Sequence, residues 1–149
     1  MKSFVIRIEI LCNKNKLSLK VPFTLYTQQE TKMQESLLRT KSMDFAVEII
    51  NLVKDLRTRH ESLIVGNQIG RSGTSIGANI HEAQFAQSQS DFISKMQIAL
   101  KETGETGYWL ELLNRTNAIS YEEYARLDNQ CKQIQYMLMA SLNTAKMRN

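Results

Sequence analysis

The chain has 149 residues, 42% hydrophobic and 23% charged, which are the proportions of an ordinary globular protein and exclude a disordered or membrane-embedded chain. Its net charge of +4 lies in residues 1–32, because these hold six of the 19 basic and two of the 15 acidic side chains and leave 13 of each for residues 33–149. Cys12 and Cys131 form no CxxC or Cys/His pattern, which argues against a disulfide scaffold or zinc site and favours a reducing cytoplasm.

Residues 1–32 show the alternation of a β-hairpin. Apolar residues occupy every second position in two runs, Ile6, Ile8 and Ile10 and then Leu17, Leu19 and Val21, with turn residues at 13–15 between them. We expect a short hairpin or a disordered extension, because an isolated hairpin is only marginally stable. Two other interpretations stay open: an extension upstream of a natural start at Met33, and a basic arm for RNA. Arg7 and Glu9 interrupt the apolar run, which argues against a secretory signal.

Residues 33–83 predict two helices from apolar positions at steps of three and four. The first is expected over about 36–57, with Ser42, Phe45, Ile49, Leu52 and Leu56 facing inward. The second is expected through about Phe85, with Leu63, Ile69, Ile76, Ile80 and Ala83 facing inward. No proline occurs after Pro22, so the commonest helix breaker is absent from this region.

Two further helices are predicted before the carboxyl terminus. The third is expected to begin with Ser90 as its N-cap and to end at 114–117, with Phe92, Met96, Ala99, Thr103, Leu110 and Leu113 inward. The capping-box pattern from Ser120 to Glu123 opens the fourth, whose inward residues are Leu127, Cys131, Ile134, Leu138 and Leu142. Similar helix lengths and short connections predict an all-α, antiparallel up-down-up-down four-helix bundle over residues 33–149.

The six glycines all fall inside predicted helices, where each costs about 0.5–1 kcal/mol relative to alanine. Four of them share one face of the second helix: Gly66, Gly70, Gly73 and Gly77. Such a face lets another helix approach closely, either within the bundle or between subunits, and the sequence leaves both open. A phosphate-binding loop is not favoured, because the segment 66–72 is one residue short, has arginine for lysine and follows no strand. Polar residues in this segment also exclude a membrane helix pair.

Polar and aromatic residues supply further candidates for packing or assembly. Arg71, Asn79 and Glu82 stand among apolar neighbours on the second helix, so we expect them to form hydrogen bonds between helices or subunits that fix the register. Tyr108 and Trp109 on the third helix are interpreted as core or interface anchors, with a stacking platform for bases as the less favoured alternative.

No catalytic constellation is predicted. Glu102 and Glu105 share a helix face, but neither His60 nor His81 completes the Glu-x-x-His pattern of a di-iron bundle. A pairing of these carboxylates with Lys101, Arg71 or water is favoured over a metal or acid–base site. We therefore expect no enzymatic activity, cofactor or metal.

The ordered segments 68–83, 92–99 and 105–113 resemble one bacterial family of four-helix bundles. The resemblance is carried by Arg71-Ser, Ser75-Ile, Asn79-Ile and Glu82 in the first segment and by Tyr108-Trp-Leu in the last, and it covers roughly residues 42–146. The family includes proteins encoded in intervening sequences of 23S ribosomal RNA genes, sometimes labelled S23 ribosomal proteins. Residues 1–32 have no counterpart in it.

The resemblance implies a ring-like homopentamer with no known enzymatic activity and an unsettled cellular role. A related accessory protein of diversity-generating retroelements is strongly basic and binds nucleic acid and a reverse transcriptase. The alternative function is therefore an RNA- or DNA-binding accessory protein, with a possible basic face formed by Arg57, Arg59, Lys95, Lys101, Lys146 and Arg148. The neutral 33–149 region departs from that relative and makes tight nonspecific RNA binding less expected.

Overall fold

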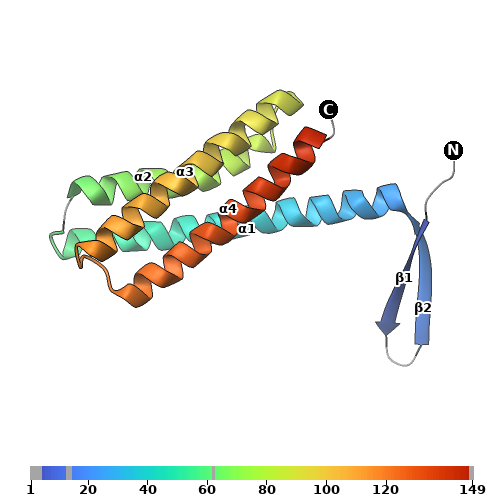
Figure 1. Cartoon of the computed structure of the whole chain (residues 1–149), viewed down its shortest axis with the longest axis horizontal. Helices are drawn as coiled ribbons and strands as arrows, with labels where there is room; N and C mark the ends of the chain where they lie inside the picture. The colour runs from blue at the N-terminus through green and yellow to red at the C-terminus, as the bar shows by residue number, and fades with distance from the viewer. Residues whose placement is uncertain (1–4, 13–14, 62, 148–149) are drawn as a thin grey trace. The chain divides into compact units, whose positions relative to one another are not determined.

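The computed structural model describes residues 5–12, 15–61 and 63–147, with side chains from residue 36 onward within those ranges. The chain divides into two compact units, Met1–Ser36 and Leu37–Asn149. Within the described residues, four helices follow one another (Figure 1): α1 (Phe23–Thr58), α2 (Leu63–Ala83), α3 (Gln89–Arg115) and α4 (Tyr121–Met147). The predicted four-helix bundle is thereby confirmed.

The first unit contains a β-hairpin and the start of α1. Strands β1 (Val5–Cys12) and β2 (Asn15–Pro22) pair antiparallel in a register that sets Ile6 opposite Val21 and Ile8 opposite Leu19. The first two residues of the expected turn lie outside the described residues. The predicted start of the first helix near Ser36 was wrong, because α1 begins at Phe23. No glycine or proline separates Phe23 from Ser36, so nothing delays the helix once the chain has passed Pro22.

The four helices of the second unit contact one another in cyclic order. α1 meets α4 through an ion pair between Glu48 and Arg126 at 2.8 Å. α3 meets α4 where the Gln89 amide donates to the Ala145 carbonyl. α2 lies between α1 and α3, since Gly73 packs against Ile49 of α1 and Ser72 is hydrogen-bonded to Thr106 of α3. Each helix thus runs antiparallel to its two neighbours, so α1 and α3 lie diagonally across the bundle and run in the same direction.

The core follows the predicted stripes closely. All of the inward residues predicted on the first and fourth helices are buried, and so are most of those on the other two. Two predictions were wrong: Leu63 is 61% exposed because it opens α2 at the end of the bundle, and Phe92 is only half-buried. Thr106, which the prediction omitted, is fully buried on α3.

The helix starts are set by side-chain caps. The N-cap of α3 is Ser88, and the prediction of Ser90 was wrong. Ser88 has an extended backbone and its hydroxyl accepts the Asp91 N–H at 3.1 Å, while the Asp91 carboxylate accepts the Gln87 N–H, so two otherwise unpaired donors are satisfied together. The predicted cap of α4 is confirmed, since the Ser120 hydroxyl accepts the Glu123 N–H at 3.1 Å.

The α1–α2 and α3–α4 loops lie at the same end of the bundle, and each contains a residue in the left-handed backbone conformation that ends the preceding helix. His60 has φ 57° after α1, and Asn117 has φ 56° after α3. In each loop the next N–H donates to a carbonyl five residues earlier, at 2.9 Å, which satisfies an end carbonyl of the helix. The Arg59 guanidinium donates to the Ala118 carbonyl at 2.8 Å and so ties the two loops together.

Candidate helix-packing and assembly site

The glycines of α2 bring this helix against α1. A Cβ atom at Gly73 would lie 2.8 Å from Ile49 Cγ1, one at Gly70 would lie 3.3 Å from Val53, and one at Gly77 would lie 3.3 Å from the Ser42 carbonyl oxygen. Real Cβ contacts are essentially never as short as the first of these distances, so α1 occupies the space that a side chain at Gly73 would fill. Three members of the predicted glycine face therefore serve packing inside the chain.

The fourth member of that face behaves differently. A Cβ atom at Gly66 would have no neighbour within 4 Å, although the residue itself is buried. The same openness holds at Gly104 and Gly107 on α3. The helix-propensity cost of these three glycines is not offset by a close approach within the described residues.

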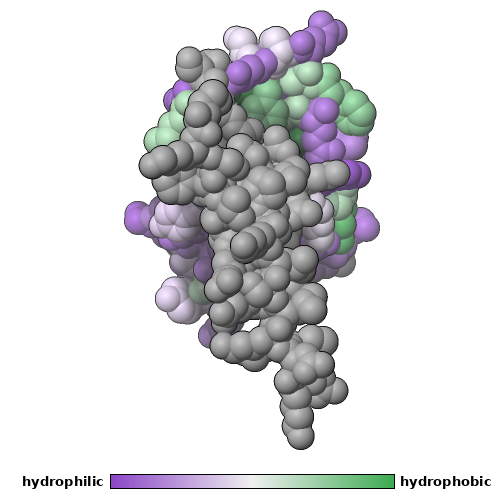
Figure 2. All heavy atoms as spheres, turned by 90° about the vertical axis from the view of Figure 1, so that its right-hand side faces the viewer, coloured by the Kyte–Doolittle hydropathy of each residue, from purple (hydrophilic) through white to green (hydrophobic). Residues whose placement is uncertain are grey.

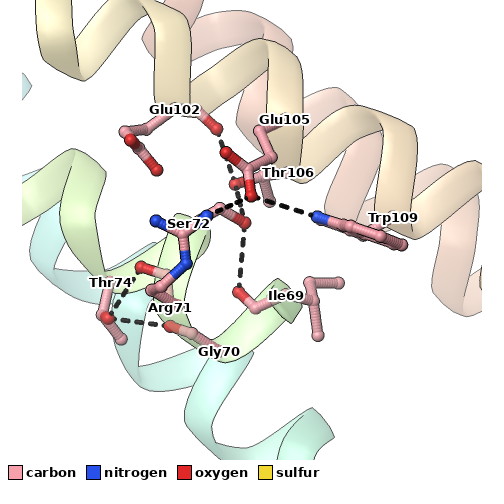
Figure 3. A network of polar contacts seen from close by, with 9 residues as sticks. All are labelled: Ile69, Gly70, Arg71, Ser72, Thr74, Glu102, Glu105, Thr106 and Trp109. Atoms are coloured by element: carbon pink, nitrogen blue, oxygen red, sulfur yellow. Dashed lines mark hydrogen bonds and ion pairs between the residues drawn. The ribbon is translucent and has the colours of Figure 1, made fainter. Parts of the chain in front are cut away.

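A polar network joins α2 to α3 near the middle of both helices (Figure 3). The Arg71 guanidinium forms an ion pair with Glu105 at 2.5 Å, and the same carboxylate oxygen accepts the Trp109 indole N–H at 3.4 Å. Beneath this pair, the Thr106 and Ser72 hydroxyl groups are hydrogen-bonded to each other at 3.0 Å, with both residues fully buried. Because both hydroxyl groups are shielded from water, a shift of one helix along the other would leave each with only a carbonyl of its own helix, so this pair favours the observed register.

A second ion pair joins the same helices nearer the α2–α3 loop. Lys95 lies 2.6 Å from Glu82, and this hydrogen bond with its opposite charge raises the pKa of the Lys95 ammonium group. Both side chains are substantially exposed, so the pair adds little to stability. Asn79 instead donates within α2, to the Ser75 carbonyl at 2.8 Å.

Glu102 sits beside this network and is 91% buried by the bundle, since its exposed fraction is 9%. Its backbone carbonyl accepts the Thr106 hydroxyl at 2.8 Å. Its Oε2 atom has no hydrogen-bond partner in the described part of the chain, and Figure 3 shows its carboxyl group on the same side of α3 as Arg71. The two glutamates predicted as a possible pair therefore differ, since Glu105 binds Arg71 and Glu102 does not.

Tyr108 and Trp109 lie edge to face, with ring centroids 4.9 Å apart. Trp109 is half-buried against the core and turns toward α2, whereas Tyr108 is 60% exposed on the outside of α3. The bundle thus holds the Trp109 ring, whereas the Tyr108 ring is open to a partner.

The six basic residues proposed as one nucleic-acid face are spread along the bundle. Arg57 and Arg59 lie at the end that carries the α1–α2 and α3–α4 loops, while Lys146 lies in the last turn of α4, at the other end. A helix the length of α4 separates these ends by roughly 40 Å. Lys95 is bound to Glu82, Lys101 is exposed in mid-helix, and Arg148 lies outside the described residues.

The outer side of α1 carries an apolar stripe that the sequence analysis missed. Met43, Val47 and Ile50 are 59%, 54% and 41% exposed, and we call these three residues the α1 stripe. At about 100° per residue, the stripe lies roughly 140° around the helix from the core residues. Spacings of four and three place its members in one row. Figure 2 likewise shows hydrophobic residues reaching the surface beside hydrophilic ones on the part of the bundle that is visible there.

The described residues show little reactive chemistry. They contain no group of three or more His, Cys, Asp or Glu side chains that could hold a metal ion. Burial raises the pKa of the Cys131 thiol to about 12, so this cysteine stays protonated at neutral pH. No helix in the same part of the chain has both the length and the apolar character to span a bilayer.

Comparison with known proteins relates this chain to a protein family and to a solved structure. Residues 34–140 match the model of the family described as 23S rRNA-intervening sequence protein. A crystal structure of a protein of unknown function from the S23 ribosomal protein family of Bacteroides thetaiotaomicron is 48% identical, with a TM-score of 0.72. That match covers 74% of this chain and 98% of the other. The comparison with curated proteins finds no match.

Proposed function

Because this chain belongs to the 23S rRNA-intervening sequence protein family, and because α1 is apolar on two sides, we propose that it is a non-enzymatic homo-oligomeric scaffold. The α1 stripe is the observation that carries the proposal. A row of apolar side chains on the side of a helix that faces away from the core favours a second contact there, because the bundle covers only the other side. Single exposed hydrophobic residues are common on protein surfaces, but three in a row at helical spacing are not scattered.

The charge of the bundle is compatible with self-association. Residues 33–149 carry equal numbers of acidic and basic side chains, so copies do not repel one another through net charge. Burying the exposed halves of the three stripe residues contributes roughly 3 kcal/mol to each contact. We expect a pentamer from the family resemblance, working in the cytoplasm, where the free thiol of Cys131 is kept reduced.

Light scattering after gel filtration of the full chain tests the proposal. The expected mass is a multiple of 17.2 kDa, five-fold for a pentamer, that falls on dilution or on substitution of Ile50 by lysine. The matched control places the same lysine at Asn143, an exposed polar position on α4, and should keep the wild-type mass. A wild-type mass of 17.2 kDa across the micromolar range would overturn the proposal.

The nucleic-acid alternative has less support from the geometry. Its basic residues are spread along the bundle from one end to the other, and Arg59 and Lys95 already bind groups of the chain. A phosphate backbone is bound by clustered cations, and such binding weakens steeply as salt rises. RNA retained at low salt and released at physiological salt is the result that would favour this alternative.

A further inference from the structure

An outward-facing surface on α3 lies at the same position along the bundle axis as the α1 stripe and, like it, carries no charged side chain. It consists of Gly104, Gly107 and Tyr108, and we call it the α3 glycine surface. No atom lies within 4 Å of a Cβ built at either glycine, and Tyr108 is 60% exposed beside them. These glycines lie about 150° around α3 from the residues that face α2. The surface is therefore a low strip of exposed backbone beside an exposed aromatic ring, open to the outside of the bundle.

The heights of the two surfaces are linked by contacts inside the chain. Ile49 of α1 meets Gly73 of α2. Ser72, which precedes Gly73 on α2, is hydrogen-bonded to Thr106 of α3. Ile49 and Thr106 therefore lie at about the same height along the bundle axis. Since α1 and α3 run in the same direction, equal steps from these two residues keep equal height.

Equal steps bring the two surfaces into register. One residue beyond the linked pair, Ile50 comes level with Gly107. Two residues before Ile49 and Thr106, Val47 comes level with Gly104. Both steps follow the 1.5 Å rise per residue that the two helices share. The bulky residues on one side of the bundle thus stand at the same heights as the open glycines on the diagonal helix.

Charges flanking the two surfaces agree with the same register. Lys54 of α1 comes level with Glu111 of α3, and both side chains are exposed. Among the described residues, Glu111 forms its ion pair with Arg115 of its own helix, at 2.5 Å, and its carboxylate can accept a second cation. A rotation about an axis parallel to the bundle would bring the two surfaces of neighbouring copies together without any sliding, and Lys54 would then face Glu111.

We infer that the α1 stripe of one copy packs against the α3 glycine surface of the next copy, with Val47 over Gly104 and Ile50 over Gly107. The contact is heterologous, because the two surfaces differ and lie on diagonal helices. Repetition of such a contact closes a ring when the rotation between copies divides a full turn. The glycines of α3 then have the close approach that the single chain does not provide. This inference rests on the proposed function and adds the two surfaces that meet.

Two single variants distinguish this contact from other modes of assembly. Val47→Asp places a negative charge in the stripe, and Gly104→Glu places a bulky side chain of the same charge on the glycine surface, so the two substituted surfaces also repel each other; both positions are exposed. Each variant alone should be monomeric, with association weakened at least about a hundredfold. Mixed together, they should form a 1:1 dimer, because one copy keeps an intact stripe and the other an intact glycine surface.

The controls separate the inference from the proposed function. Circular dichroism should show unchanged helix content in both variants, and Asn143→Asp on α4 should keep the wild-type mass. If the wild-type chain forms an oligomer and either variant keeps its full mass, or if the mixture forms no dimer, the inference is overturned and the proposed function stands. A monomeric wild-type chain overturns both.

Discussion

The contact between Gly73 and Ile49 offers the sharpest test of how α1 and α2 pack. Substituting Gly73 by alanine puts a methyl group 2.8 Å from Ile49 Cγ1 and 2.9 Å from its Cγ2. Ile49 is fully buried and branched at Cβ, so it cannot rotate away without disturbing the core. Overpacking of this kind costs about 1–3 kcal/mol, while the gain in helix propensity offsets at most about 1 kcal/mol. We expect a net loss of roughly 1–2 kcal/mol.

Urea denaturation followed by far-ultraviolet circular dichroism measures this loss, at one fixed protein concentration because the proposed association would contribute to stability. Gly66→Ala is the matched control on the same helix and the same predicted face. A Cβ atom there has no neighbour within 4 Å, so this variant should be more stable by about 0.5–1 kcal/mol. The two alanines should thus shift the midpoint in opposite directions.

A double-mutant cycle with Ile49→Ala isolates the contact itself. Ile49→Ala removes both γ carbons and leaves only the Cβ atom of residue 49, at 3.2 Å, so the methyl group of Gly73→Ala should cost much less in this background. The coupling between the two substitutions should therefore be on the order of 1–3 kcal/mol. If Gly73→Ala is as stable as the wild-type chain, or costs the same with and without Ile49, the close-packing account is refuted.

Three further outcomes follow from the α2–α3 and α3–α4 interfaces. Glu105→Ala removes the acceptor of the Trp109 indole N–H and should shift the emission of this single tryptophan, with a cost below about 1 kcal/mol because the ion pair is partly exposed. Thr106→Val leaves the buried Ser72 hydroxyl without its side-chain partner and should cost about 1–2 kcal/mol in the same denaturation assay, whereas an unchanged midpoint would deny the pair a role. The Cys131 thiol, whose pKa burial raises from 9.0 to about 12, should resist alkylation at pH 8 until the protein unfolds, as followed by mass spectrometry. Because the folded pKa is the higher one, the contribution of this thiol to stability is complete below pH 9 and is lost as the pH rises toward 12.

The helices and their inward faces could be predicted because they depend on local periodicity. The spacing of Leu127, Cys131 and Ile134 on the fourth helix, for example, specifies one buried row whatever the rest of the fold. Helix boundaries were harder to predict where two residues could each serve as the N-cap. Ser88 and Ser90 are equally good caps in isolation, and only the reciprocal bonds between Asp91 and residues 87–88 select the first of them.

The glycine face shows where local reasoning ends. Its spacing on α2 indicated that something approaches closely, and α1 lies close to Gly70, Gly73 and Gly77. Whether the approaching helix belonged to the same chain depended on the arrangement of α1, which the pattern of α2 does not contain. Gly66 has the same spacing and yet an open Cβ position, so periodicity alone could not separate it from the others.

By itself, the sequence determined the number of helices, most of the buried rows and the neutrality of the bundle, because these follow from residue type and order. Only the tertiary structure decided which helix meets the glycines and that Glu105, not Glu102, binds Arg71. It also showed that the proposed basic residues are spread along the bundle and that no described residue covers the α1 stripe. These properties depend on distances between residues far apart in the chain, and such distances exist only after the helices have packed.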